Sequence, residues 1–157
     1  MNMQDLKVYI AEKLDITKDY SGYNYQPKDR EELKSLMKQL IKERGNEGDF
    51  NDIDTSLITN MSELFYENKD FNGDISRWNT SNVTIMDSMF VNNTKFNCDI
   101  SRWNTSKVTD MSYMFENAKS FNQDISNWKV NKIKSVKSKI GIFKDCPIKE
   151  EYKPKFK

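Results

Sequence analysis

Large apolar side chains recur along the middle of the chain at a constant interval of 25 residues. The clearest sets are a methionine at 61, 86 and 111, a phenylalanine at 71, 96 and 121, and a tryptophan at 78, 103 and 128. The interval holds from residue 52 to residue 128. Periods of about 20 to 50 residues are typical of proteins whose repeats bury their apolar faces only against neighbouring repeats. The expected core of one repeat, with its equivalents in the others, is Phe71, Ile75, Val83, Met86, Met89 and Phe90.

Each repeat divides into two kinds of segment. The motif Phe-Asn-x-Asp-Ile-Ser-x-Trp alternates and is bounded by polar residues, which predicts a short strand. The motif Val-Thr-x-Met-x-x-Met-Phe spaces its apolar residues by three and four, which predicts a helical turn. The expected fold class is an α/β repeat solenoid: a leucine-rich-repeat-like, right-handed coil with one short strand and one helical turn per 25-residue repeat, a helical N-terminal cap and an irregular C-terminal cap.

Residues 1–51 are predicted to form the N-terminal helical cap. Met3, Leu6, Ile10 and Leu14 have helical spacing, which predicts a short helix over residues 2–14. A second, amphipathic helix is predicted over residues 28–45, with an aspartate at 29 as N-cap and a glycine at 45 as its end. Such a helix would cover the open apolar end of the first repeat.

Residues 52–128 form the three repeats, and residues 129–157 are predicted to be a degenerate fourth repeat and a basic C-terminal cap. Phe143 follows Phe115 by 28 residues instead of 25, and prolines at 147 and 154 do not suit a continuing ladder. The three parts are expected to make one structural domain.

The formal net charge of +1 argues against nucleic acid as a partner. The charges are unevenly distributed, because residues 51–128 carry six Lys or Arg and eleven Asp or Glu, whereas residues 129–157 carry ten Lys and three acids. Such a terminal block is more often a solvated face than an anchor on an anionic surface, and we favour the first interpretation.

The chain lacks the residues that several kinds of chemistry need. The chain has no histidine, which removes imidazole bases, histidine-activated nucleophiles and histidine-ligated metals, and its five glycines fit no phosphate-binding motif. Cys98 and Cys146 are too few for a disulfide framework or a zinc site, and we expect both to be free. We therefore expect neither an enzyme nor a cofactor.

The opening residues contain no signal-peptide core, lipobox or membrane-spanning segment. The expected location is cytoplasmic for the chain as given, and surface-exposed if a leader has been removed. We expect no membrane insertion and a monomer.

The run from Trp103 to Trp128, WNTSKVTDMSYMFENAKSFNQDISNW, resembles the repeat of BspA-like bacterial surface antigens and mycoplasma-type lipoproteins, a divergent leucine-rich-repeat group. The resemblance covers residues 52–128 most strongly. It implies a surface-exposed protein that takes part in adhesion and in binding a host molecule or another partner.

Comparison among the repeats separates invariant from variable positions. Asp74, Asp99 and Asp124 are invariant, and we expect backbone hydrogen bonds rather than calcium to satisfy them, since the Gly-rich calcium repeat is missing. We also expect Ile75 to point inward and the aspartates to lie on a concave face. Partner-contacting positions tend to vary, so the remaining recognition candidates are Arg77, Arg102, Asn127 and Tyr113.

The tryptophans at 78, 103 and 128 are interpreted either as a packing ladder, which we favour, or as an aromatic platform for sugars. The leading functional hypothesis is a non-enzymatic module that binds another protein. The alternatives are a carbohydrate-binding or adhesin module that uses the Trp and Asp rows, and a small inhibitor or immunity-type protein of phage or bacterial origin. The sequence names neither the protein partner nor a glycan.

Overall fold

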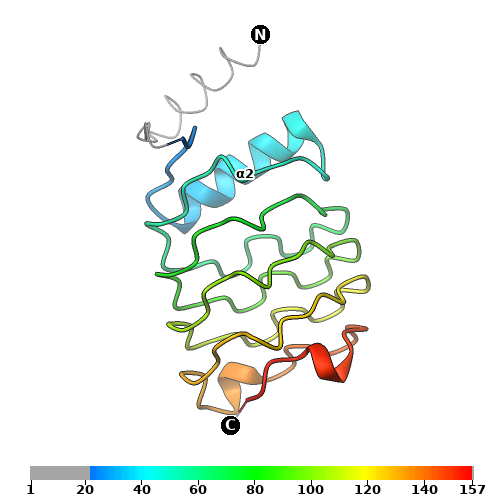
Figure 1. The fold of residues 1–157 in the computed structure, drawn as a ribbon. Helices are drawn as coiled ribbons and strands as arrows, with labels where there is room; N and C mark the ends of the chain where they lie inside the picture. Colours follow the sequence, from blue (N-terminus) through cyan, green and yellow to red (C-terminus); the bar gives the residue numbers. More distant parts are fainter. Residues whose placement is uncertain (1–21, 157) are drawn as a thin grey trace.

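The structure is a computed structural model that describes residues 22–156. In this part of the chain the regular elements are one α-helix, α2 (Arg30–Arg44), and two short 3₁₀ helices, η1 (Lys137–Lys139) and η2 (Glu150–Tyr152). After α2 the chain winds into irregular coils that lie one above another, with α2 across the first coil and η1 and η2 at the last (Figure 1). The helix expected over residues 2–14 lies outside the described residues.

Helix α2 begins and ends where the sequence predicts. The Asp29 side chain accepts a hydrogen bond from the Glu32 N–H at 3.0 Å, and this satisfies one of the free donors of the first turn. Gly45 follows the last turn with a φ of 80°, and its N–H donates to the Ile41 carbonyl at 2.9 Å. The helix buries one apolar face, made of Leu33, Leu36, Met37 and Leu40. The prediction of this helix is confirmed.

The predicted α/β repeat solenoid, with a strand and a helical turn in each repeat, is wrong. Residues 22–156 contain no strand, and their β-type pairing consists of isolated parallel bridges such as that of Asp49 with Asp74. The Asp74 side chain accepts from the Ser76 N–H at 3.0 Å, and this turn interrupts the segment that was expected to be extended. Without a sheet, the leucine-rich-repeat architecture and its concave sheet face are absent from the described part as well.

The segment predicted to be a helical turn is not helical. Ser88 and Asn92 have left-handed φ values of 56° and 59°, and a right-handed helix does not continue through such residues. The Ser88 N–H donates instead to the Ser112 carbonyl of the next coil at 2.8 Å, and the Asn92 N–H to the Glu116 carbonyl at 3.0 Å. The equivalent positions of the other two repeats are also left-handed, at Glu63, Glu67, Tyr113 and Asn117.

These bonds belong to a ladder in which every second N–H of one coil donates to a carbonyl of the next. In the first coil the donors are Met61, Glu63, Phe65 and Glu67, and their acceptors are Ile85, Asp87, Met89 and Val91, at 2.9 to 3.0 Å. Because all of these bonds run in one direction, the matching carbonyls of the first coil receive no donor from a preceding coil. Arg30 of α2 meets one of them, since its Nε–H donates to the Ser62 carbonyl at 2.6 Å.

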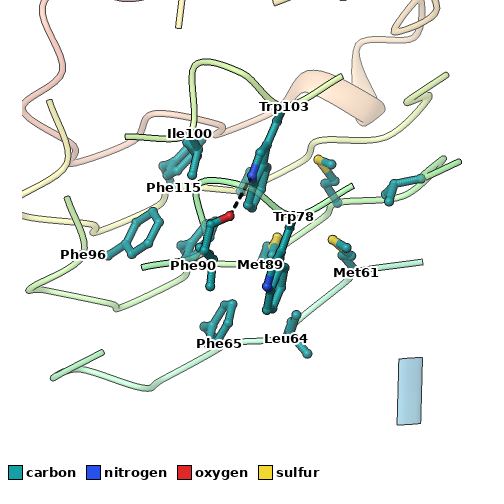
Figure 2. Close-up of a cluster of buried hydrophobic side chains, with 14 of the residues drawn as sticks. Met61, Leu64, Phe65, Trp78, Met89, Phe90, Phe96, Ile100, Trp103 and Phe115 are labelled. Carbon is teal, nitrogen blue, oxygen red and sulfur yellow. Dashed lines mark hydrogen bonds between the residues drawn. The ribbon is translucent and has the colours of Figure 1, made fainter. Parts of the chain in front are cut away.

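Columns of stacked rings fill the space between the coil segments (Figure 2). Phe65, Phe90 and Phe115 stack with centroids 5.5 and 5.4 Å apart, and Phe90 also stacks on Phe96 at 4.0 Å. All six residues of the expected core are fully buried: Phe71, Ile75, Val83, Met86, Met89 and Phe90. The core prediction, including the inward direction of Ile75, is therefore confirmed.

The last coil carries three additional residues. The Phe90 N–H donates to the carbonyl 24 residues later, at Met114, whereas the Phe115 N–H donates to the carbonyl 27 residues later, at Ile142. Phe143 consequently stacks on Phe115 at 5.7 Å and extends the phenylalanine column despite its irregular spacing. The extra residues fall between Ile133 and Ser138, next to η1.

Candidate functional site

The invariant aspartates lie at the same place in three successive coils. Oδ1 of Asp74, Asp99 and Asp124 each accepts the N–H of the serine two residues later at 3.0 Å. The hydroxyl groups of Ser76 and Ser126 donate to the same oxygens at 2.7 and 2.6 Å. Each carboxylate therefore closes a local turn, and its second oxygen is left for solvent or a partner.

These hydrogen bonds lower the pKa of all three carboxyl groups. For Asp99 the main cause is the Ser101 N–H, and for Asp124 it is the Ser126 hydroxyl. For Asp74 partial burial acts in the opposite direction, but the bonds from Ser76 and the nearby Arg77 outweigh it and the pKa falls. A depressed pKa means that the ionised form is the one the fold stabilises.

We expect acid to weaken the fold through these turns. The stabilisation is present above the unfolded-state pKa of about 4 and is lost as the pH falls through the lower pKa of the folded state. Asparagine closes the same turn at Asn79 and Asn104, where Oδ1 accepts from Ser81 and Ser106 at 3.1 Å. The triple variant Asp74→Asn, Asp99→Asn, Asp124→Asn should therefore fold at neutral pH. Between pH 6 and pH 2.5 its melting temperature should fall less than that of wild type. An unchanged acid dependence in the variant would remove the turns as its cause.

Arg77, Arg102 and Asn127 follow the aspartates in the same three coils. We call the exposed row of six residues the polar strip: Asp74, Arg77, Asp99, Arg102, Asp124 and Asn127. Its backbone is held from coil to coil, since the Arg77 N–H donates to Asn51 Oδ1 at 2.8 Å and Asn127 Nδ2 donates to the Ser101 carbonyl at 3.0 Å.

Two open hollows lie along the polar strip. The larger, of about 490 Å³, is lined by Arg77 together with Gly22, Tyr23, Arg44, Asp49, Asn51 and Asp52. The smaller, of about 270 Å³, is lined by Arg102 and Asn127 together with Lys129 and the turn at 103–106. The Arg77 side chain is 70% exposed and its nearest carboxylate, that of Asp49, lies 3.9 Å away. The structure thus brings three of the predicted recognition residues to hollows on one surface.

Tyr113 is separate from the polar strip. Its backbone N–H donates to the Ile140 carbonyl of the last coil at 2.8 Å. Its ring covers Gly141, where an added Cβ would lie only 2.5 Å from the Tyr113 Cδ1. Tyr113 therefore belongs to the basic end of the molecule.

The three tryptophans lie inside the stack. Trp78, Trp103 and Trp128 are 3 to 5% exposed, and their rings stack at 6.5 and 6.4 Å. Each indole N–H donates to a backbone carbonyl, as that of Trp103 does to Ile75 at 3.1 Å. In this position the rings offer no open face to a sugar.

Two residues that line the larger hollow, Asp49 and Arg44, were not predicted from the sequence. Asp49 stands 25 residues before Asp74, and its Oδ1 accepts the Asn51 N–H at 2.8 Å, so the row begins one coil earlier than expected. The spacing was the available signal, but Phe50 and Asn51 replace the isoleucine and serine of the motif. Arg44 lies in the same hollow and binds the Asp52 carboxylate at 2.7 and 3.0 Å.

Two groups with raised pKa values lie away from both hollows. Burial, Asp110 and Glu63 raise the pKa of Asp87, and burial raises the pKa of Cys98 to about 11, so this thiol stays protonated at neutral pH.

Within residues 22–156 no cluster of Cys, Asp or Glu side chains could hold a metal ion. In the same range no helix combines the length and the apolar composition needed to cross a membrane.

Comparison with known proteins gives one match. The model of a family described as mycoplasma protein of unknown function, DUF285, matches residues 33–150. No curated protein and no solved structure shows significant similarity to the chain. The match supports the resemblance to mycoplasma-type repeats, while the more specific BspA-like relationship stays a prediction.

Proposed function

The chain belongs to the DUF285 family of mycoplasma proteins of unknown function, and from its surface we propose that it is a non-enzymatic module that binds another protein through the polar strip. The observation that carries the proposal is that Arg77 and Arg102, which are one coil apart, each line a hollow. Arginine is enriched in protein interfaces because its planar group binds carboxylates and stacks on aromatic rings.

The polar strip has an ordered backbone and exposed charged side chains. Its turns are closed by the aspartates, and backbone and side-chain bonds tie each coil to the next. The guanidinium group of Arg77 is mostly solvated, and Arg102 is also exposed. A surface whose backbone is already ordered loses little entropy on binding, and its alternating acidic and basic groups favour a partner with complementary charges.

The same features argue against the other functional classes. Glycan binding would use the Trp row as a platform, but these rings are buried. Acid–base catalysis would need two carboxyl groups with pKa values pushed apart, yet the pKa values of the three aspartates are all lowered. An inhibitor or immunity-type protein is a special case of the proposal, and a tight one-to-one complex would distinguish it.

Affinity capture with wild type and a charge-reversed strip tests the proposal. Arg77→Glu with Arg102→Glu should abolish capture of a partner that wild type retains from lysate, because like charges across an interface cost several kcal/mol. The matched control is Lys38→Glu with Lys42→Glu, which makes the same charge change on α2, where both side chains are exposed. The control should capture normally. A partner held equally by the strip variant, with its fold verified by tryptophan fluorescence, would rule the polar strip out as the binding surface.

A further inference from the structure

A second surface lies at the last coil. From Ile125 to Lys144 the chain carries six lysines and no acidic residue. Lys144 is paired with Glu116 at 2.6 Å. In contrast, Lys132, Lys134 and Lys137 form no ion pair within the described part of the chain, and all three are exposed. Within the described residues, no ion pair therefore neutralises the charge of these three lysines.

Burial shows which way this segment faces. Ile133 and Ser138 are buried and fix the segment to the stack, whereas residues 134–137 between them are exposed. Ser138 is held further by its N–H, which donates to the Ser135 hydroxyl at 3.0 Å. We call residues 132–140 the basic bulge; it contains the residues added to the last coil.

The basic bulge also exposes large apolar side chains. Val136 is 76% exposed and Ile140 is 47% exposed, and Tyr113, whose ring lies against Gly141, is 36% exposed. The core does not need the side chains of Val136 and Ile140, because Phe143 already continues the phenylalanine column. Apolar side chains that protrude among lysines are typical of segments that settle at the interface of a membrane.

We propose that the basic bulge docks the protein on the surface of an anionic phospholipid bilayer. Lys132, Lys134 and Lys137 contact the headgroups, and Val136 and Ile140 enter the boundary between the headgroups and the acyl chains. Clusters of lysine beside a bilayer bind anionic lipid through long-range attraction that needs no fixed geometry. The basic bulge then lies on the membrane surface.

The composition of the bulge favours lipid over an acidic protein. Residues of the bulge line neither of the two hollows beside the polar strip. Its cations are all lysine, which acts as a mobile point charge, while arginine suits the fixed bidentate contacts of protein interfaces. An exposed, lysine-rich segment with exposed apolar side chains fits a fluid anionic surface better than a shaped partner.

Vesicle co-sedimentation tests the proposal. Wild type should bind phosphatidylcholine vesicles that contain one third phosphatidylglycerol, should not bind pure phosphatidylcholine, and should release as salt is raised. Lys132→Gln, Lys134→Gln and Lys137→Gln together should weaken binding by about a hundred-fold, since each lysine near such a surface contributes a factor of about five. Val136→Ser with Ile140→Ser should weaken binding and leave its salt dependence unchanged.

The control makes the same charge change elsewhere, with Lys38→Gln, Lys42→Gln and Lys95→Gln, and should bind as wild type does. Equal loss in this control would mean that net charge, and not the basic bulge, drives binding, which overturns the proposal. It is also overturned if anionic vesicles do not bind but soluble polyglutamate does with the same dependence on the bulge lysines, because the partner would then be an acidic polypeptide.

Discussion

Replacing Trp103 with alanine is expected to lower the free energy of unfolding by about 4 kcal/mol, the largest effect of any substitution considered for this protein. The ring is 3% exposed and lies between those of Trp78 and Trp128, at 6.5 and 6.4 Å. Its removal leaves a cavity in the column and deprives the Ile75 carbonyl of a donor at 3.1 Å. Urea unfolding followed by circular dichroism measures the change.

Trp103→Phe is the matched control. It keeps most of the buried ring but loses the indole donor, so we expect a smaller loss of about 1 to 2 kcal/mol. If the alanine variant were as stable as wild type, the tryptophans would not hold the coils together. An exposed aromatic platform, the alternative that the sequence left open, would then return to consideration.

Gly73→Ala is expected to destabilise the protein by about 2 kcal/mol, although it replaces only a hydrogen with a methyl group. A Cβ at this position would lie 2.4 Å from Cε2 of Phe50 and 2.8 Å from Cε2 of Phe71. Both rings are fully buried, so neither can move aside cheaply. Thermal unfolding should show a lower melting temperature.

A second substitution tests the reason for this cost. The equivalent positions in later coils hold Cys98 and Gln123, where isoleucines stand in the place of Phe50. Phe50→Ile should therefore reduce the penalty of Gly73→Ala, and the double variant should be more stable than the sum of the two single losses predicts. Additive losses would show that the Phe50 ring is not the reason why position 73 requires glycine.

The repeat period and the core could be predicted from the sequence because stacking forces equivalent residues into columns. Phe71, Ile75 and Met86 are buried because each packs against equivalent residues of neighbouring coils, as the 25-residue spacing indicates. The same columns explain why the motif repeats so closely, since Trp103 must fit between two other tryptophans.

The backbone conformation could not be predicted because apolar spacing does not report it. The motif Met-x-x-Met-Phe has helical spacing, yet Ser88 is left-handed and its N–H bonds to the next coil. Likewise the alternating motif that suggests a strand contains the aspartate and serine that turn the chain at Asp74. In both segments bonds between coils or within turns replace the regular pattern that local propensity favours.

Variation among the repeats was the sequence feature used to select candidate recognition residues on the surface. It selected Arg77, Arg102 and Asn127, which the fold brings to the hollows of one strip. It also selected Tyr113, which the fold places beside Ile140 at the basic bulge, because the sequence gives no indication of which segment of a coil faces which way. Asp49 was missed because its neighbours depart from the motif.

Site-specific photo-cross-linking tests the central claim, that the polar strip is the partner-binding surface. A benzophenone amino acid placed at Arg102, on the strip, is compared with one placed at Lys38, exposed on α2. The account predicts a cross-link from position 102 to the protein captured by wild type, and none from position 38. Cross-links from position 38 and none from 102 would place the partner on the helix and contradict the proposed function.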